Sequence, residues 1–205
     1  MLTGIGYVAF GQDGWTLKSE KEGIRVYTRT FPDSKFKAIR VELELQASLS
    51  QMVAVLLDVN AGVDWVYATK SSVLLKRVSP TELYYYSEVS LPWPFSNRDF
   101  IAQLKVRQDS ATRIVTIDGP TVADYLPVKK DIVRVARSEG KWVLRPIRKG
   151  RIRVEYELRT DPGGDIPAWL FNLFVTRGPM ESFENLKRQL KKPAYSNVRL
   201  AFIAE

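Results

Sequence analysis

Apolar and polar residues alternate through most of this chain, and a period of two is typical of β-strands that have one buried face. The two clearest runs are residues 35–46 and 151–159. Their alternating apolar residues are Ile39, Val41, Leu43 and Leu45 in the first run and Ile152, Val154, Tyr156 and Leu158 in the second. Both runs therefore predict strands with one face in a core and the other face in water.

Shorter apolar runs predict the rest of a sheet. Together with 35–46 and 151–159, we expect strands at 24–31, 72–78, 82–90, 97–107, 112–118, 131–138 and 141–148. Several of them are joined by short turn sequences, RQDSAT, SEGK and RKG, and short connections indicate antiparallel neighbours. No internal repeat or low-complexity linker interrupts the pattern, so the sequence predicts one domain.

Two segments carry a helical pattern instead. Ser48 is expected to cap a helix in SLSQMVAVLLD, and a second helix is expected from about Pro167 to Lys191, with a kink at Pro179. The stretch 169–175, WLFNLFV, is apolar almost all round and needs a cover on every side. The predicted fold class is α+β, with helices on one side of a curved antiparallel sheet and a cavity between the sheet and the terminal helix.

The amino-acid composition limits the kinds of catalytic and metal sites that the protein can contain. The 205 residues include no histidine and no cysteine, which removes the commonest general base, the thiolate nucleophile and the usual ligands of zinc. We expect no metal and no cofactor. The formal charge is +8, and residues 129–159, here called the basic segment, hold eleven basic residues against four acidic ones. This segment suggests either cross-strand Arg–Glu pairs on a solvated sheet face or an anionic partner such as a membrane surface.

Four stretches, in this order, resemble the START domain, the StAR-related lipid-transfer domain of the helix-grip superfamily. They are GWTLKSEKEGIRVYTR at 14–29, ASLSQMVAVLLDVNAGVDWV at 47–66, LPWPFSNRDFI at 91–101 and DPGGDIPAWLFNLFVTRGPMESFENLKRQL at 161–190. The chain is most similar to bacterial members of that family, over residues 14–192. The resemblance implies a helix-grip fold, in which a curved antiparallel sheet wraps around a long C-terminal helix and encloses a hydrophobic cavity for one lipid.

The resemblance also implies a function. Most of the family is not enzymatic, so we expect a protein that binds, and in some settings transfers, a lipid or another hydrophobic small molecule. The C-terminal helix and the loop at 119–127 are the expected gates of the cavity. Sterol-binding relatives carry an acid–base pair at the positions that correspond to Tyr85 and Leu104 here, so neither half of that pair is present.

Strand alternation and the resemblance together select the residues that should contact a ligand. The expected ligand-binding residues are Leu83, Tyr85, Ser87, Phe100, Ala102, Leu104, Tyr125, Trp169, Leu173 and Phe174. Four residues of the strand at 97–107 are expected to face away from the cavity: Asp99, Ile101, Gln103 and Lys105.

Two other functions stay open. Polyketide cyclases and aromatases use the same scaffold, and their chemistry needs acid–base groups in the cavity. Candidates for such groups are Arg40, Glu42 and Glu44 if the strand phase is wrong by one residue, or Asp64, Tyr85 and Arg98. Nucleic-acid binding by the basic segment has no recognisable motif in its favour, so no nucleic-acid partner is expected.

The stretch LPWPFSNRDF sets rigid apolar residues beside charged ones. Pro92 and Pro94 cannot donate hydrogen bonds in a central ladder, so we interpret LPWPF as a bend between two strands. Arg98 and Asp99 then begin the next strand and point to opposite faces. We therefore expect Arg98 to be a structural anchor, held by carbonyl groups or a carboxylate, and not part of a catalytic pair.

Two terminal segments lie outside the resemblance. Residues 1–13 are interpreted as the remnant of a trimmed signal sequence or as residues added by cloning, because no basic region precedes their apolar run. Residues 193–205 are expected to add a strand, cover a helix or contact a partner. The sequence leaves the compartment open between cytoplasm and periplasm, with peripheral membrane contact through the basic segment.

Overall fold

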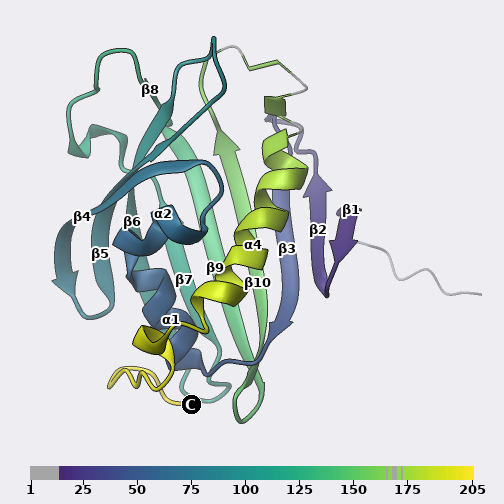
Figure 1. Ribbon diagram of the computed structural model, residues 1–205, viewed down its shortest axis with the longest axis vertical. Coiled ribbons are helices and arrows are strands. Elements are labelled where there is room, and N and C mark those ends of the chain that lie inside the picture. The colour runs from purple at the N-terminus through teal and green to yellow at the C-terminus, as the bar shows by residue number, and fades with distance from the viewer. Residues whose placement is uncertain (1–13, 165, 168–169, 172) are drawn as a thin grey trace, which may run out of the picture.

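Within residues 14–164, 166–167, 170–171 and 173–205, which the computed structural model describes, ten strands form one sheet that curls around a helix (Figure 1). In chain order the strands are β1 (Thr16–Lys21), β2 (Ile24–Arg29), β3 (Ala38–Leu45), β4 (Thr69–Ser79), β5 (Glu82–Val89), β6 (Arg98–Gln108), β7 (Val115–Pro120), β8 (Val133–Arg134), β9 (Arg137–Arg148) and β10 (Arg151–Asp161). Their order across the sheet is β1-β2-β3-β10-β9-β7-β6-β5-β4, and the short β8 pairs with β6 in parallel.

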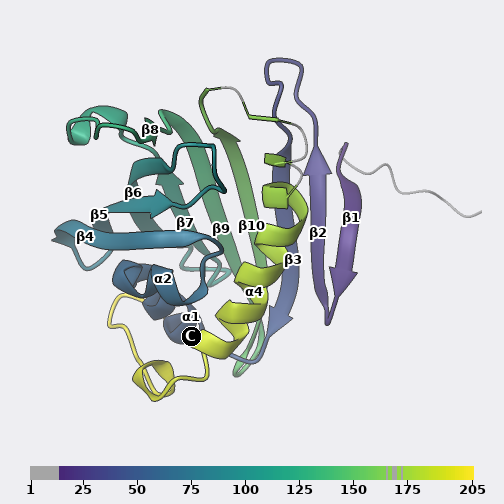
Figure 2. The ribbon, with the colours of Figure 1, turned by 45° about the horizontal axis from the view of Figure 1, so that its top comes forward.

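The curvature brings the two ends of the sheet round the helix α4 (Gly178–Gln189). Figure 2 shows β4, β5 and β6 on one side of α4 and β1, β2 and β3 on the other. The remaining helical elements are α1 (Leu49–Leu57), η1 (Val59–Ala61), α2 (Gly62–Trp65), η2 (Ala123–Tyr125), the π-helical turn η3 (Leu173–Arg177) and η4 (Pro193–Tyr195). This arrangement confirms the α+β helix-grip architecture that the sequence predicted.

The alternating strands point as their pattern predicts. In β3 the four apolar residues from Ile39 to Leu45 are all buried, with Val41 fully inaccessible. The outer face of the same region carries ion pairs between neighbouring strands. Arg40 pairs with Glu157, and Glu44 accepts from both Arg151 and Arg153. The strand phase was therefore correct, and part of the basic segment consists of cross-strand Arg–Glu pairs.

Three elements differ from the prediction. Residues 16–21 form a strand that was not predicted, and the strand expected at 131–138 is broken, with Val133 and Arg134 in β8 and Arg137 and Ser138 at the start of β9. The turn expected at SEGK does not exist, because Gly140 lies inside β9 and pairs with Gly119 of β7. A Cβ atom at Gly140 would lie 3.5 Å from the hydroxyl oxygen of Tyr156, which is an ordinary van der Waals distance, so this glycine is an ordinary strand residue and not a turn.

Helix α1 begins as its sequence predicts and is reinforced from the end of the chain. Ser48 and Gln51 form a reciprocal capping box. The carboxylate of Glu205 also accepts hydrogen bonds from the backbone N–H groups of Leu49 and Ser50, at 3.0 and 2.9 Å. Residues 193–205 thus cover one end of a helix, which was one of the three roles expected for them.

The C-terminal helical segment is interrupted where the proline predicts. Pro179 has no N–H group, and its ring would clash with the carbonyl of Val175 in a regular α-helix. The chain forms the wider turn η3 just before it, and α4 begins at Gly178 and ends at Gln189, two residues before the predicted end.

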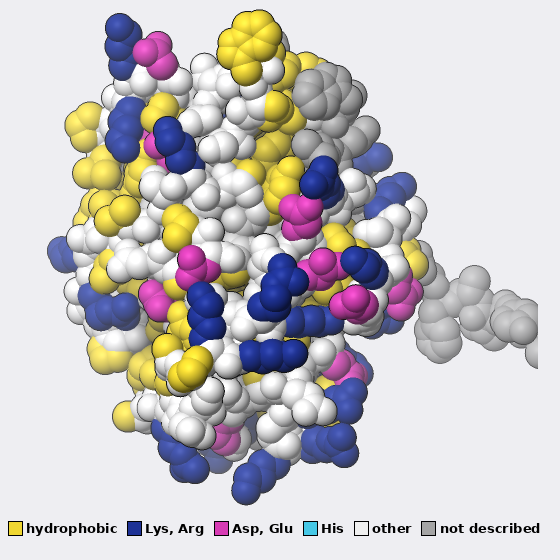
Figure 3. All heavy atoms as spheres, in the orientation of Figure 1, with side chains coloured by type: hydrophobic (Ala, Val, Ile, Leu, Met, Phe, Trp, Pro, Cys, Tyr) yellow, Lys and Arg dark blue, Asp and Glu magenta, His cyan; other side chains and the backbone are white. Residues whose placement is uncertain are grey.

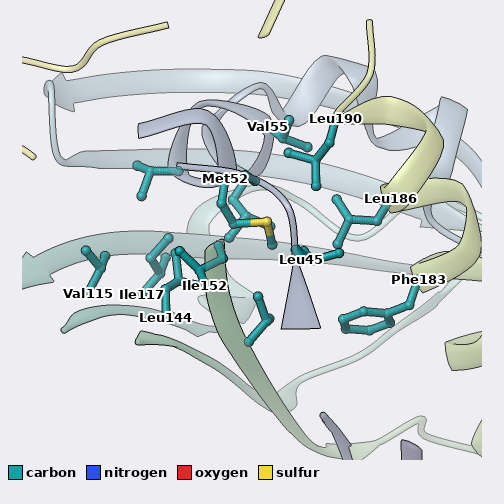
Figure 4. Packing of buried hydrophobic residues seen from close by; sticks show 14 of the residues in the cluster. Leu45, Met52, Val55, Val115, Ile117, Leu144, Ile152, Phe183, Leu186 and Leu190 are labelled. Carbon is teal, nitrogen blue, oxygen red and sulfur yellow. The ribbon is translucent and has the colours of Figure 1, made fainter. Parts of the chain in front are cut away.

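The hydrophobic core lies between α1, α4 and the concave face of the sheet. Figure 4 shows Phe183 and Leu186 of α4, and Leu190 directly after it, directed toward Leu45 and Val55. Phe183 and Leu186 are each at most 2% exposed. The space between α1 and the C-terminal part of α4 is therefore filled with side chains.

Candidate functional site

A cavity of about 350 Å³ lies between the concave face of the sheet and the segments that cover it. Its walls come from seven strands, from the region of α1 and α2, and from residues 162–183. The lining is mostly apolar, and it includes aromatic rings from several elements. A volume of this size lies within the range of about 300–1,000 Å³ that is typical of small-molecule sites.

Strand alternation placed six of the expected ligand-binding residues in the wall of this cavity. They are Tyr85, Ser87, Phe100, Ala102, Leu104 and Phe174. Tyr85 and Phe100 contact each other edge to face, with ring centroids 5.7 Å apart. Phe174 packs on Tyr67 in the same way, at 5.7 Å.

The other expected residues do not join this group. Leu83 is fully buried in the hydrophobic core but is not part of the cavity wall. Tyr125 lies on the outer face of the sheet, where its ring stacks on Tyr84 with the centroids 4.8 Å apart. Trp169 lies outside the described residues, and the side chain of Leu173 is not described either.

The loop at 119–127, which was expected to be a gate, lies partly at the cavity and partly on the outer face. Gly119 and Thr121 line the cavity, but the N–H group of Val122 donates to the carbonyl of Ile101 at 2.8 Å, which takes the loop to the outer face. There Arg134 donates to the carbonyls of three loop residues, Ala123, Leu126 and Pro127. The second half of this loop is thus pinned outside the cavity. The same loop explains why Ile101, on the outward face as predicted, is fully buried.

Sequence reasoning missed an aromatic cluster on the opposite wall. Trp142 of β9 lies at its centre, with ring centroids 4.2 Å from Tyr156 and 5.5 Å from Phe183. Trp65 of α2 meets Trp142 edge-on at 6.3 Å. The alternation of 151–159 already pointed Tyr156 inward. Trp142 was missed because the turn assigned to SEGK hid the alternation of β9.

Connections between elements form one end of the cavity wall. Lys37, in the connection between β2 and β3, is exposed to solvent and also lines the cavity. Leu91 lines it from the connection between β5 and β6, and Pro162 and Ile166 line it from the segment before η3. These three connections form the end of the cavity that is here called the mouth.

Arg98 is an anchor at the mouth, as the sequence predicted. It is 6% exposed, and its guanidinium donates to the carbonyl oxygens of Ser96, Pro162 and Gly163 at 2.6, 3.3 and 3.1 Å. Burial lowers the pKa of Arg98. Because Pro162 and Gly163 lead into the C-terminal helical segment, Arg98 ties the start of β6 to the element that covers the cavity.

The two neighbours of Arg98 anchor other segments. Asp99, which is completely buried on the outer face, accepts two hydrogen bonds from Arg134 at 2.7 and 3.1 Å. Asn97 donates to Glu88 at 2.7 Å, and Glu88 also pairs with Lys70 at 2.8 Å. The hydrogen bond from Lys70, followed by that from Asn97, lowers the pKa of Glu88 even though burial opposes this. The Asn-Arg-Asp sequence therefore connects three segments at the mouth.

Two phenols face the interior of the cavity. Burial raises the pKa of Tyr85 to about 12. Burial and the nearby phenol of Tyr85 both raise the pKa of Tyr156. Each residue keeps some surface that a water molecule could touch, and since both also line the cavity, that surface belongs to the cavity. Both phenols are protonated at neutral pH.

Most of the residues considered for an enzyme lie on the outer face or are already engaged, and Tyr85, which faces the cavity, is the exception. Arg40, Glu42 and Glu44 form ion pairs on the outer face, and Asp64 pairs with Lys192 at the surface. Among the described residues, no group of three or more acidic side chains could hold a metal ion. No helix in the described part of the chain is long and apolar enough to cross a membrane.

Comparisons with known proteins agree with this architecture. A family model for the START domain matches residues 7–195. The crystal structure of a STAR-related lipid transfer protein from Xanthomonas axonopodis is 37% identical and superposes with a TM-score of 0.80, over 88% of this chain and all of that one.

Two relatives found by sequence cover most of the chain. An uncharacterised protein of Pseudomonas aeruginosa is 31% identical over 92% of both chains. The phosphatidylcholine transfer protein of Mus musculus is 27% identical over 80% of this chain and 78% of its own length. The family model spans nearly the whole described sheet and its covering helix, and the chain belongs to the START domain family.

Proposed function

We propose that this protein binds one lipid, or another hydrophobic small molecule, in the cavity beneath the C-terminal helical segment and transfers it between membranes. The observation that carries the proposal is the cavity itself, with about 350 Å³ of mostly apolar space and one mouth. Relatives that are named for lipid transfer support the same function.

In the proposed function the protein binds its ligand and does not catalyse a reaction. A cyclase would need an acid and a base that converge on the ligand. The ionisable side chains of the described wall, apart from the tyrosines, are Lys37, Asp58 and Arg98. Arg98 is held by three carbonyls, and Asp58 accepts a hydrogen bond from Tyr195 at 2.7 Å. This leaves no convergent acid–base pair among the described residues, which weighs against the cyclase alternative.

Loading from a membrane requires the mouth to approach the bilayer. Trp93 sits in the connection between β5 and β6 and is 92% exposed. Leu91 and Arg98, at the two ends of that connection, both line the cavity, so Trp93 projects beside the mouth. Figure 3 shows hydrophobic side chains gathered near the top of the face that carries α4, and Lys and Arg side chains spread over its middle and its lower edge, with a few near the top. Tryptophan is favoured at the interface between water and lipid, so we assign membrane contact to Trp93.

This assignment changes the expected roles of the gates and of the basic segment. The pinned loop at 122–127 is not needed for opening, and the segment from Pro162 to η3 is the proposed gate. The turn between β9 and β10, at Arg148–Arg151, lies at the end of β9 remote from Arg137. At the other end of β9, Arg137 lies opposite Asp161 of β10 in the strand register, next to the mouth. Only part of the basic segment can therefore reach a membrane that meets the mouth, and the dependence of binding on salt should be modest.

A vesicle assay tests the proposal. Donor vesicles carrying a fluorescent lipid are mixed with protein and with unlabelled acceptor vesicles, and transfer is followed over time. We expect transfer by the wild-type protein and a loss of about thirtyfold in vesicle affinity for Trp93→Ala, because burial of a large aromatic side chain stabilises by about 2 kcal/mol. Ile147→Ala is the matched control, since Ile147 is also exposed but lies near the β9–β10 turn.

Each negative result of these experiments would refute a different claim. A wild-type protein that neither extracts nor transfers lipid would refute the proposed function. Equal vesicle binding by Trp93→Ala and Ile147→Ala would leave lipid binding intact and refute only the assignment of the membrane contact.

A further inference from the structure

The turn between β9 and β10 sets arginine opposite arginine in two cross-strand pairs. In the strand register, Arg145 lies opposite Arg153, and Arg148 lies opposite Arg151. With Lys149 in the turn itself, five basic side chains come together within residues 145–153. Like charges directly opposite each other on neighbouring strands destabilise a sheet. This arrangement therefore opposes folding, and an anionic partner would relieve the repulsion.

One carboxylate offsets part of this charge. Glu44 of β3 pairs with both Arg151 and Arg153. Arg145, Arg148 and Lys149 are exposed, and none of the three has an ion-pair partner among the described residues. Five cations and one anion leave an excess of four positive charges at the turn. Elsewhere on the outer face, cross-strand ion pairs join basic to acidic residues: Arg25–Glu42, Arg40–Glu157, Lys105–Glu82 and Arg107–Asp118.

The turn lies at the opposite end of the sheet from the mouth. Strand β10 runs from the turn to Asp161, directly before Pro162 of the mouth, and its 11 residues span about 35 Å at a rise of about 3.3 Å each. Figure 1 shows the turn at the lower end of the molecule, and Figure 3 shows Lys and Arg side chains along that lower edge. Salt screens charges over about 10 Å at 0.1 M. The charges of the turn therefore act on a surface that meets the turn, and not on a membrane at the mouth.

The chemistry of the turn identifies the class of partner. A stable protein interface buries about 800 Å² on each side around an apolar core, but Ile147 is the one large apolar side chain that β9 and β10 expose in the described structure. Single-stranded nucleic acids are held largely by stacking on aromatic rings, and residues 145–153 contain none. The anionic surface of a membrane needs only basic side chains close to it. The turn therefore fits an anionic membrane best.

We propose that the β9–β10 turn is a second membrane contact, which binds an anionic bilayer at the end of the molecule opposite the mouth. The protein then touches two membranes at once, with the mouth on one and the turn on the other. This bridging rests on the proposed function, in which the mouth meets a bilayer, whereas the anionic contact itself does not depend on it.

A triple variant tests the contact. Arg145→Gln, Arg148→Gln and Lys149→Gln together, here called the turn variant, remove the three charges that have no partner. Binding is measured by co-sedimentation with vesicles of phosphatidylcholine alone and with vesicles of equimolar phosphatidylcholine and phosphatidylglycerol, at several salt concentrations. Thermal unfolding of each protein is recorded in parallel.

A second triple variant is the matched control. Lys18→Gln, Lys76→Gln and Lys141→Gln together, here called the control variant, change the net charge by the same amount. These three lysines are exposed, and they lie on β1, on β4 and further up β9. A loss of binding that depends only on the net charge of the protein would appear equally in both variants.

We expect wild-type protein to prefer the anionic vesicles at low salt and to lose this preference as the salt rises. Each basic residue near an anionic surface contributes about a fivefold gain in affinity, so the turn variant should bind the anionic vesicles about a hundredfold more weakly than wild type. The control variant should lose less than about fivefold. Phosphatidylcholine vesicles carry no net charge and report on the mouth alone, so the turn variant should bind them as wild type does. Its melting temperature should not fall, because the substitutions remove like-charge pairs.

Light scattering from the anionic vesicles tests the bridging. Wild-type protein should cluster these vesicles, whereas the turn variant and Trp93→Ala should each bind through the contact that remains and cluster none. Clustering by Trp93→Ala at the wild-type level would refute the bridging and leave the anionic contact in place.

Three results would overturn the anionic contact. Wild-type protein that binds both kinds of vesicle equally at low salt would do so, as would a turn variant that binds the anionic vesicles as tightly as the control variant. The third is binding of a duplex DNA fragment that the turn variant loses, with no preference of wild-type protein for anionic vesicles. Turn-dependent binding of anionic vesicles by a protein that extracts no lipid would instead refute the proposed function and leave the contact standing.

Discussion

Replacing Arg98 by alanine separates an anchor from a ligand-binding residue. The substitution removes three hydrogen bonds from a buried guanidinium to the carbonyls of Ser96, Pro162 and Gly163. Hydrogen bonds from charged groups each contribute about 1.5 kcal/mol at the low end, which gives about 4–5 kcal/mol for three. Burial of the cation offsets part of this, as the lowered pKa of Arg98 indicates. We therefore expect a net loss of about 3 kcal/mol in the free energy of unfolding.

The loss is measured by urea titration and by thermal unfolding. For a chain of this size, about 3 kcal/mol corresponds to a fall of roughly 6–12 °C in the melting temperature. Arg107→Ala is the matched control, because Arg107 lies on the same strand and forms its ion pair with Asp118 at the surface. It should cost less than about 1 kcal/mol. Arg98→Lys should recover little stability, since an ammonium group cannot reach three divergent carbonyls as a planar guanidinium does.

The comparison with ligand binding decides between the two roles. If Arg98→Ala is as stable as Arg107→Ala but has lost its affinity for lipid, Arg98 contacts the ligand and the anchor interpretation is wrong. The enzyme hypothesis would then need to be reconsidered, because a cationic group at the mouth would be available for chemistry.

Two further predictions concern stability. The pKa of Glu88 is lowered chiefly by its hydrogen bond from Lys70. Its carboxylate therefore makes its full contribution to stability at pH values above the ordinary glutamate pKa of about 4.3. This contribution is lost as the pH falls below that value. The stability difference between wild type and Glu88→Gln should therefore shrink between pH 7 and about pH 3, and a constant difference in urea titrations would contradict this. Glu205→Ala removes the carboxylate that caps α1 at Leu49 and Ser50, and should cost about 1–2 kcal/mol by thermal unfolding; an unchanged melting temperature would show that the capping box suffices.

Local patterns predicted the parts of the fold that depend on local chemistry. The alternation in β3 and β10 identified the inner face, and the sequence before α1 identified a helix cap, because burial and capping both leave a periodic or positional signature. Arg98 was recognised as an anchor because strand alternation separates it from Asp99. These successes all depend on residues within one element.

The errors depend on contacts between distant segments. Gly140 was interpreted as a turn residue, and only its pairing with Gly119 of the distant strand β7 shows that it lies inside β9. Tyr125 was placed at the gate because nothing local reveals that Arg134 holds its loop against the outer face. The capping of α1 by Glu205 joins residues more than 150 positions apart, and no sequence period records such a contact.

The central claim, that one lipid occupies the cavity beneath the C-terminal helical segment, is tested most directly by native mass spectrometry of protein incubated with lipid vesicles. The account predicts a complex of one protein with one lipid. It also predicts that Ala102→Phe, which places a ring in the cavity, abolishes that complex while the protein stays folded by thermal unfolding. Absence of any lipid complex in the wild-type protein, or an undiminished complex in the folded Ala102→Phe variant, would contradict the claim.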